Sequence, residues 1–155
     1  MTTERTPNAR AAMLIRKPVG QVFEAFVDPA VTSRFWFTKS SGRLEAGKQV
    51  TWYWALQDVS VQVTVKTVTK NSRILIEWSA YGGPTTVEWS FAPRNDHTTF
   101  VSIAHWGFTG SEEEQAKQAI GATEGFALVL AGLKALLEHN VILNLVPDRF
   151  PDGMP

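Results

Sequence analysis

Five segments between Val50 and His105 alternate apolar and polar residues, and this alternation constrains the fold more than any other feature. Successive side chains of a β-strand point to opposite faces, so each segment is expected to be a strand with one buried face. The apolar side carries no Asp, Glu, Lys or Arg, and its one titratable group is His105. Its members are Val50, Trp52, Trp54, Val59, Val61, Val63, Val65, Ile74, Ile76, Trp78, Val87, Trp89, Phe91, Val101, Ile103 and His105. Such a face has to be covered by another element or has to line a cavity.

Short polar turns join these segments, which predicts an antiparallel meander of five strands. The turns are Gln57-Asp58, Asn71-Ser72, Gly82-Gly83-Pro84 and Arg94-Asn95-Asp96. On the opposite face of the sheet, Glu77 and Glu88 are expected to meet solvent. Phe100 and Trp106 also stand on that outer face, where they predict either a dimer contact or coverage by the C-terminal tail. The tail would reach them through Leu145, Val146 and Phe150.

A strand and two short helices are expected before the meander. The strand covers residues 11–16, and a helix with apolar residues at helical spacing follows Pro18, whose ring suits a first turn. Asp28 and Pro29 end this helix and start a second one, with Asp28 as N-cap and Pro29 at the first helical position. The second helix ends in the aromatic residues 35–37.

A long helix, residues 112–139, is expected after the meander. Ser111 and Glu114 predict a capping box at its start, and Asn140 is expected to end it in a left-handed conformation. At about 1.5 Å per residue the helix would extend roughly 40 Å, long enough to cross the sheet. The expected sheet-facing stripe is Ala116, Ile120, Thr123, Phe126 or Ala127, Leu130, Leu133 and Leu137. Residues 141–155 are expected to form a tail on the surface.

Length and composition bound the class of protein. With 155 residues the chain is expected to form one domain, residues 1–155, with a disordered leader over residues 1–8. Its 15 basic and 15 acidic residues cancel, so no basic footprint for nucleic acid is expected. The chain has no cysteine, its first residues lack the apolar core that a signal peptide needs, and its longest apolar stretch, 126–133, is too short for a membrane span. We therefore expect a cytoplasmic protein.

The sequence offers no motif for a metal, a cofactor or a catalytic nucleophile. The three histidines, His97, His105 and His139, match no metal-ligand spacing. Neither a phosphate-binding loop nor a nucleophile elbow is present. We therefore assign no metal ligand, no cofactor and no catalytic residue.

The aromatic side of the meander is the strongest candidate for a binding site, because four of the six tryptophans fall on it. The helix expected opposite carries the small residues Ala119, Gly121, Ala122, Thr123 and Gly125. Large residues on one wall and small ones on the other leave room for a ligand, although the same rings would also serve as an ordinary core. His105 would supply a polar handle or an acid–base group near neutral pH. The candidate ligand-binding residues are Trp52, Trp54, Trp78, Trp89, Phe91, His105, Thr123 and Phe126.

The order of these elements resembles the SRPBCC, or START-like, superfamily, and within it the branch named for the activator of the heat-shock-protein ATPase. The resemblance covers about residues 10–139 and depends on the order and spacing of several segments. They are residues 17–26, Asp28-Pro29, residues 35–37, 74–78, 101–108 and 125–126, with Leu130, Leu133, Lys134, Leu136 and Leu137. The resemblance implies an α+β helix-grip fold, in which a curved antiparallel sheet wraps around the long C-terminal helix and encloses a cavity.

Members of this superfamily bind lipids, sterols, polyketides and other apolar molecules, and some are cyclases or aromatases. With the aromatic wall, the resemblance predicts a binding protein for a small apolar or aromatic ligand, as a monomer or weak homodimer. One alternative is a cyclase, aromatase or lyase in the same cavity, for which polar groups would have to converge on the ligand. The available polar groups are His105, Thr123, Tyr81 and Thr85. Another is a chaperone-linked interaction module, although co-chaperones resembling this domain carry a further N-terminal domain, so ATPase activation is not expected.

Overall fold

The computed structural model describes residues 8–55, 58–79 and 82–153. Within them one strand and two short helices precede the meander, and a long helix and a short one follow it. The strands are β1 (Ala9–Ile15), β2 (Lys39–Ser40), β3 (Gln49–Trp54), β4 (Val59–Thr69), β5 (Arg73–Trp78), β6 (Thr85–Pro93) and β7 (Thr99–Trp106). The helices are α1 (Val19–Val27), α2 (Pro29–Thr32), α3 (Glu112–His139) and α4 (Leu145–Arg149). Gln57, expected in a turn, and Tyr81, a candidate polar group, lie outside the described residues.

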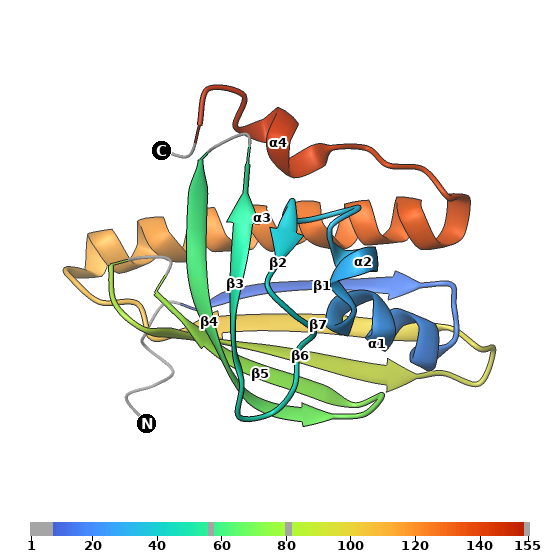
Figure 1. Ribbon diagram of the computed structural model, residues 1–155. Coiled ribbons are helices and arrows are strands. Elements are labelled where there is room, and N and C mark those ends of the chain that lie inside the picture. The colour runs from blue at the N-terminus through green and yellow to red at the C-terminus, as the bar shows by residue number, and fades with distance from the viewer. Residues whose placement is uncertain (1–7, 56–57, 80–81, 154–155) are drawn as a thin grey trace.

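All seven strands belong to one antiparallel sheet in the order β1-β7-β6-β5-β4-β3-β2. The predicted meander is therefore confirmed as β3 to β7, and the two-residue strand β2 is an addition that the alternation could not reveal. Figure 1 shows β1, β6 and β7 running along α3, whereas β3 and β4 rise across it. A register shift between Val65 and Thr67 interrupts the β4–β5 ladder, and such bulges bend a strand and increase its twist. The sheet thereby curves around the helix, as the helix-grip fold requires.

The ends of α3 are fixed by the predicted caps. The Ser111 hydroxyl accepts a hydrogen bond from the Glu114 backbone N–H at 3.1 Å, and the Glu114 carboxylate accepts one from the Ser111 N–H at 2.9 Å. At the other end Asn140 has φ 54° and ψ 42°, the left-handed conformation that asparagine tolerates. The helix runs without interruption through Gly121 and Gly125.

The buried face of α3 differs from the expected stripe in its first half. Ile120 was expected on the sheet-facing side, but 70% of its side chain is exposed, and Ala119 and Ala122 are buried instead. From Phe126 onwards the buried positions include the predicted Leu130 and Leu133. The periodicity favoured the larger apolar residue, but the inward-facing positions of this part of the helix are Ala119 and Ala122.

The second half of α3 is also tied to the free edge of β1. Lys134 Nζ donates to the Leu14 carbonyl oxygen at 2.8 Å, and Glu138 accepts from the Arg16 backbone N–H at 2.8 Å. Lys134 and Glu138 are themselves paired at 2.7 Å. Burial raises the pKa of Glu138, but the hydrogen bonds from Lys134 and Arg16 outweigh burial and hold this pKa below its ordinary value. These contacts satisfy backbone groups that an edge strand would otherwise leave unpaired.

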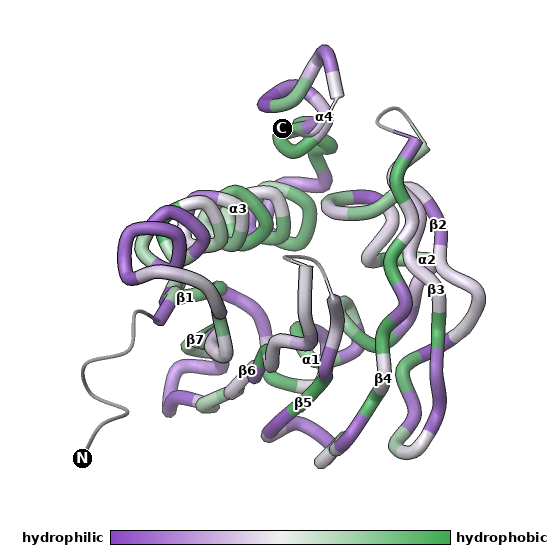
Figure 2. The backbone as a smooth tube through the Cα atoms, turned by 90° about the vertical axis from the view of Figure 1, so that its left-hand side faces the viewer, coloured by the Kyte–Doolittle hydropathy of each residue, from purple (hydrophilic) through white to green (hydrophobic). Residues whose placement is uncertain are grey.

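By length and composition α3 could cross a membrane, since it has 28 residues and contains an apolar stretch of 18. Its apolar face packs on the sheet, mainly on β1 and also on β7. Figure 2, which looks along the helix, shows the strands curving beneath and beside it, with α4 above. We therefore interpret α3 as the core helix of the fold.

The C-terminal tail lies against α3 and not against the outer face of the sheet. Helix α4 contacts α3, and its Val146 is 6% exposed. The predicted coverage of Phe100 and Trp106 by Leu145, Val146 and Phe150 is therefore wrong. The side chain of Phe100 remains 40% exposed, so the outer face of β7 is open.

Two glycines of α3 provide a test of this packing. A methyl group on Gly132 would lie 3.2 Å from the Phe35 carbonyl oxygen, whereas one on Gly121 would meet nothing within 4 Å. Alanine favours a helix by roughly 1 kcal/mol over glycine. We therefore expect Gly121→Ala to raise the free energy of unfolding by about 0.5–1 kcal/mol and Gly132→Ala to lower it, as measured by denaturant midpoints. An equal gain in both variants would contradict the close approach of α3 to Phe35.

Candidate functional site

A cluster of aromatic rings lies between the sheet and α3, with Trp36 at its centre. The Trp36 ring centroid is 4.8 Å from that of Trp52, 5.8 Å from Phe126 and 6.1 Å from both Trp78 and Trp89. Phe37 stacks on Trp52 at 4.8 Å. Edge and tilted contacts of this kind stabilise aromatic clusters beyond simple area burial. The rings come from the loop after α2, from three strands and from α3, so they fix the distance between these elements.

A cavity of about 570 Å³ adjoins this cluster, between α3, the ends of β3 and β4, and α4. Its aromatic wall is formed by Trp36, Trp54, Trp78 and Phe126, which the valines Val59 and Val61 of β4 extend. The volume lies within the range of roughly 300–1,000 Å³ that is usual for small-molecule sites.

Three of the residues that α3 contributes to the cavity lining are small. They are Gly121, Ala122 and Gly125, and a Cβ atom built on either glycine would meet nothing within 4 Å. The helix at this point therefore presents backbone and open space to the rings opposite. Of the five small residues predicted on the facing helix, Gly121, Ala122 and Gly125 line the cavity, whereas Ala119 and Thr123 are not among its lining residues.

Among the residues described as lining the cavity, three are charged, and they lie at its mouth. They are Lys117 and Glu124 on α3 and Arg149 on α4. Arg149 donates to Glu124 at 2.6 Å, and its guanidinium lies 4.8 Å from the centre of the Phe150 ring. Val146 and Phe150 complete the lining from the same side. Helix α4 thus forms one wall of the mouth and is held to α3 by a half-exposed ion pair.

The predicted ligand-binding residues fall into two groups. Trp54, Trp78 and Phe126 line the cavity. Trp52 and Trp89 are each 1% exposed and lie behind Trp36, while Phe91 packs at 5.3 Å against Phe23 of α1. Thr123 donates its hydroxyl hydrogen to the Ala119 carbonyl oxygen at 2.7 Å. The structure therefore brings three of the eight to the cavity lining, and a ligand contact by the others stays a prediction.

His105 is completely buried behind two of the cavity-lining rings. Its ring centroid lies 5.8 Å from Trp78 and 5.7 Å from Phe126. The Trp78 indole N–H, which can only donate, lies 3.2 Å from His105 Nε2. Nε2 therefore acts as an acceptor, and Thr85 Oγ1 faces the same nitrogen at 2.7 Å. Burial lowers the pKa of His105 to about 4, so the ring is neutral at pH 7.

Two indole N–H groups in this region lack a hydrogen-bond partner within the described chain, those of Trp54 and Trp89. The side-chain oxygen of Gln118, which also lines the cavity, is unpaired as well. Buried polar groups without partners cost stability, and native structures contain few of them. Trp54 and Gln118 line the cavity, whereas Trp89 lies behind Trp36.

Sequence reasoning missed several residues of this site. Trp36 was noted only as part of an aromatic run, although it is the central ring of the cluster. The run of three aromatic residues after a capped short helix was the available signal. Arg149 and Phe150 were missed because nothing in the local sequence of the tail indicates that it returns to α3.

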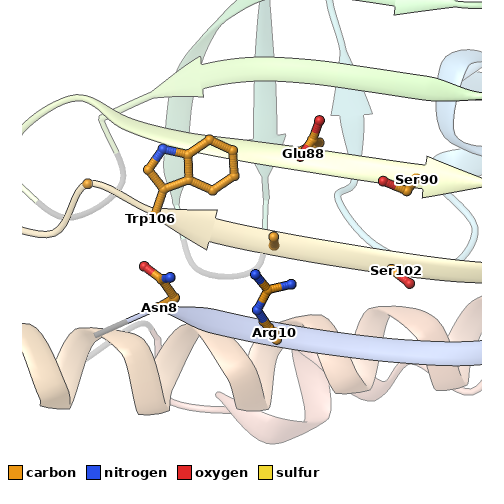
Figure 3. A pocket seen from close by; sticks show the side chains of 8 residues that line it. Asn8, Arg10, Glu88, Ser90, Ser102 and Trp106 are labelled. Atoms are coloured by element: carbon orange, nitrogen blue, oxygen red, sulfur yellow. The ribbon is translucent and has the colours of Figure 1, made fainter. Parts of the chain in front are cut away.

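A second hollow, of about 480 Å³, lies on the opposite face of the sheet. Figure 3 shows Arg10 and Asn8 near the start of β1, Trp106 and Ser102 on β7, and Glu88 and Ser90 on β6. Ala104 is also part of its lining. Glu88 is paired with Arg73 of β5, and Glu77 with Lys66, so both glutamates face outward as predicted. In the described part of the chain, no group of three or more His, Asp or Glu side chains is placed to hold a metal ion.

Residues 16–138 match the family described as Activator of Hsp90 ATPase homolog 1-like protein. The chain belongs to this family. Its match covers more than half of the sequence and confirms the resemblance inferred from the order of the segments. A search of curated proteins finds no match.

Solved structures agree with this family assignment. Protein SSP2350 from Staphylococcus saprophyticus is 31% identical, with a TM-score of 0.75 over 88% of this chain and 95% of that one. DynU16, from the dynemicin biosynthetic locus, is 20% identical, with a TM-score of 0.73 over 88% of this chain and 49% of its own. Aha1 from Colwellia psychrerythraea, solved as a dimer, is 15% identical, with a TM-score of 0.73 over 85% of this chain and 96% of that one. At the last two identities the likeness shows the fold alone.

The buried His105 predicts a specific dependence of stability on pH. Folding lowers the pKa of His105 from 6.5 to about 4. Between these two pH values the ring is therefore mostly protonated in the unfolded chain and mostly neutral in the folded one. This contribution to stability is complete above pH 6.5 and is lost as the pH falls towards 4, by about 3 kcal/mol. We expect His105→Gln to remove this loss from the pH profile of the free energy of unfolding.

The matched control is His97→Gln, because His97 is exposed in the turn between β6 and β7. It should leave the profile of the wild type unchanged. A wild-type profile that coincides with that of His105→Gln between pH 7 and pH 4 would show that His105 titrates normally in the folded protein.

Proposed function

We propose that this protein binds a small apolar or aromatic ligand in the cavity between the sheet and α3. The observation that supports this most directly is a cavity of about 570 Å³ with an aromatic wall on one side and Gly121, Ala122 and Gly125 on the other. A core selected only for packing would fill such a space with side chains. The family assignment adds a fold that can hold such a cavity.

The lining defines the class of ligand. Apolar surface contributes about 25 cal/mol per Å², so a ligand that buries roughly 200 Å² gains about 5 kcal/mol before ordering costs. The rings favour planar or aliphatic molecules without a charge in their buried part. DynU16, a structural relative, comes from a biosynthetic locus, which is consistent with a ligand of biosynthetic origin.

A cyclase or aromatase in the same cavity is supported less well. An acid–base role needs a group that reaches the ligand and titrates near the working pH. His105 is buried behind Trp78 and Phe126, its Nε2 accepts from Trp78, and its pKa is about 4. The Thr123 hydroxyl is occupied by the helix backbone. We therefore place binding ahead of catalysis.

The cellular setting and the assembly are proposals of the same kind. We propose a cytoplasmic protein, because the chain contains no cysteine. A monomer or weak homodimer remains our proposal for its assembly, and the dimer of the Colwellia relative is consistent with the second form. Only the description of the family points to the chaperone-linked module, so we place it last.

A leucine in the helical wall tests the position of the binding site. Gly125→Leu has space for its side chain within the cavity and should fold normally while occupying the volume available to a ligand. We expect it to weaken binding at least tenfold. The measurement is a titration of aromatic and fatty-acid probes, read by the fluorescence of the cavity tryptophans.

The matched control is Ala127→Leu, which adds the same side chain at an exposed position of the same helix. Its affinity should equal that of the wild type. If Gly125→Leu folds and binds as tightly as the wild type, the ligand is not held in this cavity. A wild type that binds nothing across the panel would reject the binding function itself.

The position of α4 predicts that the C-terminal segment slows ligand release. Truncation after Asn144 removes Val146, Arg149 and Phe150 from the mouth, and we expect dissociation to become at least tenfold faster in stopped-flow measurements. Glu124→Gln removes only the ion pair. Since exposed pairs contribute about 0.2–1 kcal/mol, its effect should be about fivefold or less.

The control for the ion pair is Glu45→Gln, which removes the half-exposed pair with Lys48 outside the cavity. It should leave dissociation unchanged. Equal dissociation rates for the truncated and complete chains would show that the ligand leaves by another route.

A further inference from the structure

The outer face of β1, β7 and β6 has a charge pattern that is complementary to itself. In the strand registers, Ala104 of β7 lies directly between Arg10 of β1 and Glu88 of β6. Neighbouring strands are about 4.8 Å apart, so the two opposite charges flank the β7 axis at equal distances. Within the described chain Arg10 makes no side-chain hydrogen bond or ion pair. Glu88 is paired with Arg73, and its side chain remains 26% exposed.

The central strand of this face has two aromatic residues with small ones between them. Its outward residues are Phe100, Ser102, Ala104 and Trp106. Phe100 is 40% exposed, and Ser102, Ala104 and Trp106 line the hollow seen in Figure 3. In the described chain α3 and α4 both lie away from this face of the sheet.

We infer that this face binds a second copy of the chain, with a two-fold axis parallel to β7 between the two sheets. In such an interface each contact occurs twice, because residue i meets j and j meets i. Rotation about this axis places Arg10 of each copy opposite Glu88 of the other. The same rotation brings each β7 over its counterpart, so that Phe100 meets Phe100 at one end of the contact and Trp106 meets Trp106 at the other.

The other simple orientation is disfavoured by charge. A two-fold axis across the strands through Ala104 would place Arg10 against Arg10 and Glu88 against Glu88. Like charges in direct contact are unfavourable, whereas opposite charges fix the register of an interface. Face-to-face sheets pack at roughly −30°, which the strand-parallel axis accommodates with the strands of both copies nearly aligned.

Charge reversal tests this arrangement in a way that a structural defect cannot imitate. In a homodimer of Arg10→Glu, both contacts place the new glutamate opposite Glu88. In a homodimer of Glu88→Lys, both contacts place the new lysine opposite Arg10, so each variant brings like charges together twice. A mixture of the two variants forms a heterodimer in which both contacts are again between opposite charges. We expect sedimentation equilibrium to show a wild-type mass that rises towards that of a pair with concentration. Each single variant should associate at least about tenfold more weakly, and the mixture should recover the wild-type affinity.

The control is Lys39→Glu, which makes the same change of charge on β2, at the opposite edge of the sheet. It should associate like the wild type, and circular dichroism should confirm that every variant is folded. The inference is overturned if the wild type stays a monomer at its highest soluble concentration. It is overturned equally if Arg10→Glu associates like Lys39→Glu, or if the mixture fails to associate more strongly than the single variants. None of these outcomes affects ligand binding, since the cavity lies on the other face of the sheet.

Discussion

The contact of Trp36 with rings from the sheet and from α3 is the constraint on which the rest of the structure depends. Its ring meets Trp52 and Trp78 on one side and Phe126 on the other, so it sets the spacing between the two layers. The loop that carries it is fixed in turn, because Asp28 caps α2 and the Thr32 hydroxyl donates to Ala25 at 2.6 Å. A short helix thus determines how closely a long helix can approach the sheet.

The two halves of α3 differ in how closely they pack against the rest of the core. Around Gly132 the helix approaches the Phe35 backbone closely, and Leu130 and Leu133 are completely buried. Around Gly121 and Gly125 the side chains are too small to reach the rings opposite, and a cavity remains. Unfilled volume and unpaired indole N–H groups both reduce stability. The unfilled volume and the unpaired Trp54 indole N–H therefore place a cost in stability at the cavity.

The sequence predicted the parts of this architecture that local rules determine. The alternation gave the strands and their inner face, and the capping pattern gave both ends of α3, because these depend on neighbouring residues only. The burial of Ala119 in place of Ile120 could not be predicted, since it depends on which neighbour the helix meets. The same holds for the return of α4 to the cavity mouth. Trp36 was visible in the sequence, but its central position follows from the angle between α2 and the sheet.

The separation of charge between the two faces of the sheet bears on how a ligand would lie in the cavity. Strand alternation places Glu77 and Glu88 outside and leaves the inner wall to uncharged rings, with His105 neutral behind them. The charges that line the cavity, on Lys117, Glu124 and Arg149, belong to the helices at its mouth. Moving an unpaired charge into the apolar interior costs far more than leaving it at this rim. A ligand with one polar end would therefore keep that end between α3 and α4 and place its apolar part against Trp54 and Trp78.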